Sequence, residues 1–201
     1  MLDGVLKKRI DPPMNRLAVV LCRRGVGANS VTVAGLVLGL AAAVAIAFGS
    51  LWGGLVLILV SRLADGLDGA VARQTAPTDL GGYLDIVFDY VFYGIIPLAF
   101  AILDPAANGL AAAVLLMSFY ANGASFLAFA IMAEKRKLAT EQRGRKSLFF
   151  TTGLAEATET IAAFVLFCLF PQYFAAIAYV FAAMTTWTFV SRIRLSLNSF
   201  G

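Results

Sequence analysis

The chain of 201 residues contains no histidine, only two cysteines and few charged side chains. Without histidine it lacks the commonest general base and the commonest ligand of transition metals. Any metal must therefore be held by oxygen ligands, which favours a hard ion such as Mg²⁺ or Mn²⁺. Cys22 and Cys168 lie far apart in apolar surroundings, which indicates buried thiols rather than a disulfide framework.

Charged residues make up 14% of the chain, whereas a soluble domain carries about a quarter. The mean hydropathy is +0.83. Most of the surface is therefore expected to face lipid rather than water. The N-terminal stretch MLDGVLKKRIDPP has no apolar h-region, so we expect no cleavable signal peptide.

Six apolar runs are each long enough to cross a bilayer as a helix, which takes about 20 residues. The breaks between them carry turn sequences such as GSLWGG, TAPTDLGG, DPAANG and FPQY. The pattern predicts an all-α integral membrane protein with six transmembrane helices. The runs cover residues 30–48, 51–71, 80–103, 110–133, 148–170 and 173–190.

The segment before the first run predicts an amphipathic helix lying on the membrane surface. A short lead-in loop is the alternative. We expect residues 1–28 to form this juxtamembrane segment and residues 29–201 to form the six-helix domain. The helix would gather Leu17, Val19, Val20 and Leu21 on one side, with Arg16, Arg23 and Arg24 nearby.

All 16 lysines and arginines fall on one side of such a six-span topology. The positive-inside rule then places both termini in the cytoplasm and the protein in the inner membrane. The net charge of +4 would favour anionic lipid head groups. The basic charge does not favour nucleic acid as a binding partner, because the sequence contains no separate basic domain to bind it.

The stretch DGLDGAVARQTAPTDLGGYLDIVFD places five aspartates between two apolar runs. Asp65 and Asp68 are three residues apart and share a helix face, as do Asp85 and Asp89 across the turn. Two helices joined by a short turn run antiparallel, so these faces can meet below the inner membrane surface. Asp79, beside the sequence TAP, reads as a helix N-cap or loop residue.

Four neighbouring carboxylates repel one another, and each is costly to bury. Protonation would relieve the repulsion, and so would pairing with Arg62 and Arg73, although two arginines cannot balance four aspartates. One or two divalent cations would balance them, and oxygen ligands suit Mg²⁺. Nearby glycines and an alanine leave room for the base or sugar of a ligand.

The stretch reads D-x2-D-G-x2-A-R-x7-G-x3-D-x3-D, which resembles the signature of the CDP-alcohol phosphatidyltransferase family. The resemblance extends to ANSVTVAGL in the first run and covers most of the chain. It is closest to a small bacterial branch of the family, through GLAEATETI and SRLADGLDGA. The matching positions are Asp65, Asp68, Gly69, Ala72, Arg73, Gly81, Asp85 and Asp89, with Asn29 and Thr32 in the first run.

This resemblance implies the transfer of a phosphatidyl group from CDP-diacylglycerol to the hydroxyl of an alcohol, with release of CMP. It implies that Asp65, Asp68 and Asp85 bind metal, and that Asp89 is the general base as well as a metal contact. The cations, expected to be two, would stabilise charge on the leaving CMP and orient the phosphorus. The resemblance also implies a homodimer, and a cytidine diphosphate site formed by Asn29, Thr32, Gly69, Ala72, Arg73 and Gly81.

A base is also needed on chemical grounds, because an alcohol attacks poorly until its proton is removed. A carboxylate bound to a cation is a weak base, so a good base should lie at the edge of the metal cluster. Asp89, the last acid of the array, suits that position.

Charged residues outside the signature are candidates for binding the acceptor. Glu156 and Glu159 could line its pocket, or could instead pair with Arg62 or form a dimer contact. A basic group could clamp a phosphate on the acceptor, although positive-inside anchoring explains it equally well. This basic group consists of Arg143, Arg145, Lys146 and Arg192.

The acceptor itself stays open. Glycerol 3-phosphate is the first expectation, with inositol phosphate, serine and an uncharged alcohol or amine as alternatives. A divalent-cation transporter is the rival from another class. Transport sites usually lie near the bilayer midplane between structural repeats. Here the acids cluster towards one side and no repeat is visible, so the enzyme is favoured.

Overall fold

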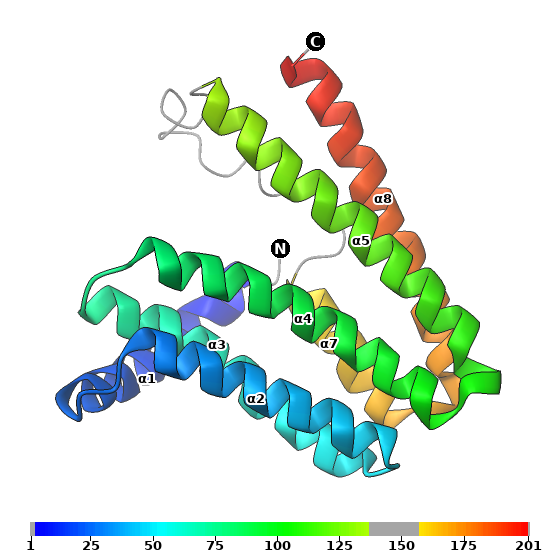
Figure 1. Ribbon diagram of the computed structural model, residues 1–201, viewed down its shortest axis with the longest axis horizontal. Coiled ribbons are helices and arrows are strands. Elements are labelled where there is room, and N and C mark those ends of the chain that lie inside the picture. The colour runs from blue at the N-terminus through cyan, green and yellow to red at the C-terminus, as the bar shows by residue number, and fades with distance from the viewer. Residues whose placement is uncertain (1–2, 137–156, 201) are drawn as a thin grey trace.

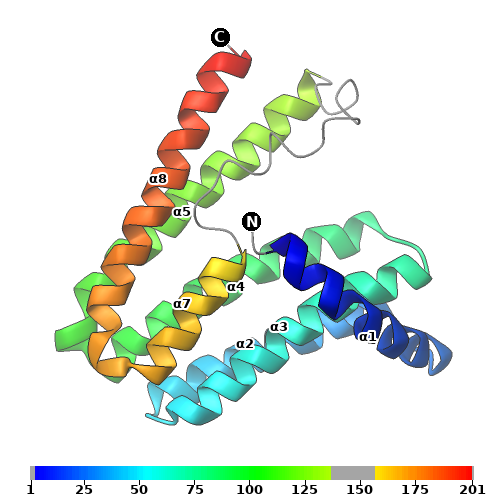
Figure 2. The ribbon, with the colours of Figure 1, turned by 180° about the vertical axis from the view of Figure 1, so that it is seen from behind.

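The computed structural model describes residues 3–136 and 157–200, and every regular element in those ranges is helical. Figures 1 and 2 show the helices from opposite sides. In chain order they are α1 (Asp3–Arg23), α2 (Ala28–Ala47), α3 (Leu51–Gln74), α4 (Asp79–Leu103), α5 (Pro105–Lys135), α7 (Ala157–Leu169), the 3₁₀ turn η1 (Pro171–Tyr173) and α8 (Phe174–Phe200).

Short turns with suitable chemistry separate the helices. Gly49, between α2 and α3, has a φ of +85°, a left-handed conformation that side chains with a Cβ disfavour. The Thr78 hydroxyl accepts a hydrogen bond from the Gly81 amide at the start of α4. Asp104 caps α5 in the same way, and Pro105 occupies its first turn. The apolar pattern predicted a start near residue 110, whereas α5 begins at Pro105.

Four segments in the described part of the chain are long and apolar enough to cross a membrane: α2, α4, α5 and Pro171–Phe200. α3 has the length, with 24 residues, but it carries charged residues in its C-terminal half. α7 is described as a shorter apolar helix of 13 residues. The structure thus confirms a helical protein of the membrane class, while the count of six spans stays a prediction.

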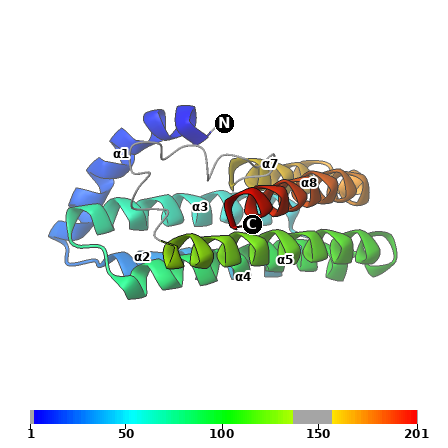
Figure 3. The ribbon, with the colours of Figure 1, turned by 90° about the horizontal axis from the view of Figure 1, so that it is seen from above.

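The helices form two groups. α2 packs against α3 and α4, and α1 lies against α3. α5 and α8 run side by side, as Figures 1 and 3 show. Their C-terminal ends diverge from the α2–α4 group, as Figures 1 and 2 show. The packing of α4 against α5 connects the groups, and so does α7, which contacts both α3 and α8. The C-terminal end of α3 and the N-terminal end of α4, which carry the aspartates, lie together at one end of the first group (Figure 1).

An aromatic core holds the helices together. The rings of Phe100 and Phe174 stack with centroids 4.8 Å apart, and Phe167 packs against both. In lipid, close van der Waals packing drives helix association more than water exclusion does. The fully buried phenylalanines of this core are Phe92, Phe100, Phe164, Phe167 and Phe174.

A smaller apolar cluster attaches α1 near the aspartates. Ala18 of α1 is fully buried against a cluster that includes Leu67 and Val71 of α3. Leu17 and Val20 of α1 are 47% and 44% exposed. The expected N-terminal helix is therefore present. Its exposed apolar residues suit a membrane surface, and its position at that surface stays a prediction.

Candidate active site

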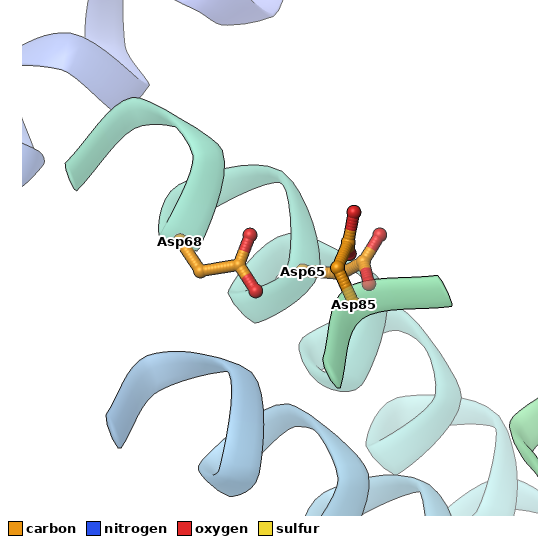
Figure 4. A group of neighbouring side chains, drawn as sticks. All are labelled: Asp65, Asp68 and Asp85. Carbon is orange, nitrogen blue, oxygen red and sulfur yellow. The ribbon is translucent and has the colours of Figure 1, made fainter. Parts of the chain in front are cut away.

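Three carboxylates converge where α3 meets α4. Asp65 and Asp68 project from α3, and Asp85 approaches them from α4 (Figure 4). One oxygen of each lies within 4.8 Å of the others. Oxygen ligands at about 2.0–2.6 Å from a hard cation lie no more than about 5 Å apart, twice the metal–ligand distance. The three side chains can therefore share one ion with little movement.

The environment of Asp68 supports a cation at this position. Its side chain is buried, with a relative exposure of 6%. Its Oδ2 atom is buried and accepts no hydrogen bond from the described residues. An unsatisfied carboxylate oxygen is costly inside a protein. A hard divalent ion would satisfy Oδ2 and offset the repulsion from Asp65 and Asp85, so this donor set fits Mg²⁺ or Mn²⁺.

Asp89 lies beside this group and is held by an arginine. Arg62 Nη1 donates a 2.6 Å hydrogen bond to Asp89 Oδ1 and lies 3.4 Å from Asp65 Oδ1. The guanidinium stacks on the Phe92 ring, 3.7 Å from its centroid. Within the described residues, the acids close enough to share an ion are Asp65, Asp68 and Asp85. A second ion at Asp89 would share that carboxylate with Arg62.

A pocket of about 400 Å³ opens beside the carboxylates. Asp68 and Asp85 form part of its wall, and the N-terminal ends of α2 and α4 border it. Amide groups at helix N-termini favour anions such as phosphates. The remaining lining residues are mostly small: Gly27, Ala28, Asn29, Ser30, Thr32, Gly69, Ala72, Thr75, Ala76, Pro77, Thr78, Gly81 and Gly82.

The pocket contains most of the residues expected to bind the nucleotide. Asn29, Thr32, Gly69, Ala72 and Gly81 all line it. A Cβ on Gly81 would lie 3.0 Å from Asn29 Oδ1, so glycine allows α4 to approach α2 closely at this wall.

Arg73 is not a lining residue. It is exposed, and its Nη1 atom lies 3.5 Å from the position that a Cβ on Gly69 would occupy. Its expected contact with the nucleotide stays a prediction.

Arg192 of α8 is half-buried against α5. Its Nη1 atom donates to Asn122 O at 2.9 Å, to Asn122 Oδ1 at 2.8 Å and to Ser125 Oγ at 2.9 Å. A Cβ on the adjacent Gly123 would overlap the ring of Tyr90, the residue after Asp89. The part of α5 that holds Arg192 therefore packs against α4 next to Asp89.

Of the other expected acceptor residues, the structure describes Glu159. Arg143, Arg145, Lys146 and Glu156 lie outside the described residues. Glu159 lies in the first turn of α7 and is half-buried.

Asp79 is not the N-cap of α4, as one of the two expectations from the sequence had it. Thr78, not Asp79, is the N-cap of α4, because the Thr78 hydroxyl accepts the hydrogen bond from the Gly81 amide. Asp79 lies in the first helical turn, where a negative charge is favourable.

Sequence reasoning did not identify several residues of this region. Phe92 follows Asp89 by one helical turn, and Ser61 precedes Arg62; their apolar or small side chains gave no chemical signal. Asn122 and Ser125 are three residues apart on α5. Polar residues at this spacing inside an apolar run share a helix face, and this pattern could have indicated that they bind a polar partner.

Comparison with known proteins adds independent information. The profile of CDP-alcohol phosphatidyltransferase matches residues 26–190. The chain is 43% identical over 202 residues to the inner membrane protein YnjF of Escherichia coli (strain K12), covering 99% of this chain and 98% of that protein. It is 39% identical over 93 residues to archaetidylinositol phosphate synthase of Methanothermobacter thermautotrophicus, covering 46% of this chain and 44% of that protein.

The fold is shared with a solved enzyme. Phosphatidylinositol phosphate synthase (PgsA1) of Mycobacterium tuberculosis with CDP-DAG bound has a TM-score of 0.67 at 22% identity, covering 90% of this chain and 92% of that one. The same protein in complex with manganese and citrate has a TM-score of 0.66 at 22% identity, covering 90% and 87%. The chain belongs to the CDP-alcohol phosphatidyltransferase family.

Proposed function

We propose that this protein transfers a phosphatidyl group from CDP-diacylglycerol to the hydroxyl of an alcohol and releases CMP, as a step in phospholipid synthesis. The observation that carries the proposal is the group of Asp65, Asp68 and Asp85 at the wall of a pocket lined by small residues and helix N-termini. A solved relative by fold binds CDP-DAG, which supports the same donor here.

The three carboxylates would hold Mg²⁺ or Mn²⁺, and we expect two ions in all. A bound divalent ion would offset the charge that develops on the departing CMP. The pocket would bind the cytidine diphosphate part, with Asn29, Thr32, Gly69, Ala72 and Gly81 as its walls. A structure of the relative by fold contains manganese, which supports a divalent ion at this acidic group.

Asp89 would act as the general base. The acceptor oxygen attacks the phosphorus that carries the diacylglycerol, and its proton passes to the Asp89 carboxylate. The bond between that phosphorus and the bridging oxygen breaks, and CMP leaves with this oxygen. Asp89 lies at the edge of the carboxylate group, beside Asp65, which suits a base that must reach the acceptor rather than the nucleotide.

We propose a phosphorylated alcohol as the acceptor. The hydrogen bonds that Arg192 makes to described residues go to neutral oxygens of Asn122 and Ser125, so its charge is available to an anion. Glycerol 3-phosphate and inositol phosphate are the two candidates. The second gains support because one relative is named archaetidylinositol phosphate synthase, and the solved protein of the same fold is a phosphatidylinositol phosphate synthase. Serine or an uncharged alcohol or amine would instead give Glu156 and Glu159 a role.

The proposed setting is the inner membrane, with both termini in the cytoplasm and the active site facing that side. A 43% identical relative is an inner membrane protein. We further propose that residues 29–201 form the catalytic domain, that residues 1–28 lie along the membrane surface, and that two chains form a homodimer.

The test is CMP release by the purified protein. The protein would be incubated with CDP-diacylglycerol, Mg²⁺ or Mn²⁺ and each of glycerol 3-phosphate, inositol phosphate, serine and glycerol. We expect CMP only with metal and with a phosphorylated acceptor, and none from the Asp85→Asn variant. CMP release with serine or glycerol alone would refute the acceptor proposal. No CMP with any acceptor, together with Mn²⁺ flux into liposomes, would establish the transporter instead.

A further inference from the structure

We propose that Arg62 is a positioning residue for the reaction: its guanidinium holds the Asp89 carboxylate at the edge of the carboxylate group. This inference rests on the proposed function, in which Asp89 removes the acceptor proton. Arg62 lies outside the family signature quoted above, and its side chain would not touch the substrate in the proposed mechanism.

Arg62 connects the two helices that carry the acids. One nitrogen, Nη1, serves both helices: it lies 2.6 Å from Asp89 Oδ1 on α4 and 3.4 Å from Asp65 Oδ1 on its own helix. The Arg62 side chain is only 9% exposed. A charge-assisted hydrogen bond shielded from water is strong and directional, so it restricts where the Asp89 carboxylate can lie.

Two further contacts restrict the guanidinium itself, and one of them is anchored in turn to α2. Nη2 donates to Ser61 Oγ at 3.3 Å, and that hydroxyl donates in turn to the Gly35 carbonyl of α2 at 2.7 Å. One face of the guanidinium lies on the Phe92 ring. Fixed donors and a planar face are properties of arginine that lysine lacks. Asp89 is therefore held by a group that α2, α3 and α4 position together.

The charge of Arg62 has a second consequence. Its positive charge lies beside Asp65, a member of the group that would bind the divalent ion. A fixed positive charge there opposes the binding of a cation. Loss of Arg62 should therefore slow the reaction and tighten metal binding at the same time. Tighter metal binding follows from loss of the charge alone, so the fall in kcat without a rise in KM is the result that distinguishes positioning of Asp89 from a purely structural role.

The experiment compares five proteins with the wild type: Arg62→Met, Arg62→Lys, Asp89→Asn, the Arg62→Met/Asp89→Asn double variant and Arg136→Met. Arg136 is the matched control, because its guanidinium, like that of Arg62, lies over a phenylalanine ring, in this case Phe200. Arg136 donates hydrogen bonds to backbone carbonyls at the C-terminal end of α8. Each protein is tested for kcat and KM in CMP release, and for Mn²⁺ affinity by calorimetric titration without substrate.

We expect Arg62→Met to lower kcat by about tenfold or more, since a displaced catalytic group can cost a factor of about 100. Its KM for CDP-diacylglycerol should stay within about threefold, because Arg62 does not line the nucleotide pocket. Its Mn²⁺ affinity should rise by about threefold or more. Arg62→Lys should keep the wild-type Mn²⁺ affinity and recover only part of kcat. Arg62→Met should add little to the loss already caused by Asp89→Asn.

Wild-type kcat in Arg62→Met would overturn the inference, as would weaker Mn²⁺ binding together with a raised KM. Equal tightening of Mn²⁺ in Arg136→Met would also overturn it. Failure of the proposed function looks different: the wild type would release no CMP with any acceptor. In that case tighter Mn²⁺ binding in Arg62→Met, but not in Arg136→Met, would support the electrostatic part and refute the catalytic part.

Discussion

Replacement of Asp68 by asparagine gives the sharpest test of the metal site, because the structure predicts that it stabilises the metal-free protein and weakens the response to metal. Asp68 is buried, and its Oδ2 atom lacks a hydrogen-bond donor among the described residues. Its carboxylate lies within 4.8 Å of those of Asp65 and Asp85. In the metal-free protein the Asp68 charge should therefore be destabilising.

The magnitude follows from these contacts. Two unit charges 4.8 Å apart repel by about 3 kcal/mol at an effective dielectric constant of 20, and exposure of Asp85 reduces this value. An unsatisfied buried oxygen costs about 1–3 kcal/mol. An amide removes the charge and can donate to Asp65. Asp68→Asn should therefore raise metal-free stability by about 1–3 kcal/mol, or roughly 3–10 °C in Tm for a chain of this size.

With metal the wild type gains more stability than the variant does. A ligand present at about 100 times its Kd stabilises the wild type by about 2.7 kcal/mol, or roughly 5–10 °C. Loss of one carboxylate of the three should weaken binding by about 100-fold or more, since even outer-shell changes cost 10–100-fold. At the same Mn²⁺ concentration the variant should then gain only about 1 °C.

The assay is thermal unfolding in detergent with EDTA or with MnCl₂. Asp79→Asn is the matched control: it removes an acid from the same stretch but outside the carboxylate group, so the full Mn²⁺ response should remain. The reasoning is refuted if Asp68→Asn responds to Mn²⁺ as the wild type does, or if it unfolds at a lower temperature than the wild type in EDTA.

Three other substitutions test separate parts of the structure. Gly81→Ala places a Cβ 3.0 Å from Asn29 Oδ1, so the pocket wall must shift and the KM for CDP-diacylglycerol should rise by about tenfold, measured by CMP release. Gly39→Ala places a Cβ 2.7 Å from the Phe92 ring and should destabilise the fold by about 1–3 kcal/mol, measured by thermal unfolding. Arg192→Met should raise the KM for the phosphorylated acceptor by about 10-fold to 100-fold, because a charged hydrogen bond contributes about 1.5–3 kcal/mol.

The two glycine substitutions have controls in the same molecule. Gly94 and Gly109 have open space where a Cβ would lie, so alanine at either position should leave KM and Tm unchanged. Unchanged KM in Gly81→Ala would mean that the nucleotide does not use this wall. Unchanged Tm in Gly39→Ala would mean that Phe92 can move freely. If Arg192→Met raised the KM for CDP-diacylglycerol as much as the KM for the phosphorylated acceptor, Arg192 would have a structural role instead of a role in acceptor binding.

Much of the fold and part of the site follow from local patterns. Apolar runs, capping residues and turn glycines are properties of neighbouring residues, so helix positions could be predicted from them, with errors at ends such as Pro105. The spacing of Asp65 and Asp68, and the short turn before Asp85, required the three carboxylates to come near one another.

The relations between distant residues were decided only by tertiary packing. Arg62 and Asp89 are 27 positions apart, and their 2.6 Å contact depends on how α3 and α4 lie against each other. The pocket needs the start of α2 beside the start of α4, and Arg192 needs its partners on α5. Periodicity shows which face a residue occupies on its own helix. The neighbour that meets that face depends on the rotation and contact of whole helices, which shape complementarity between side chains determines.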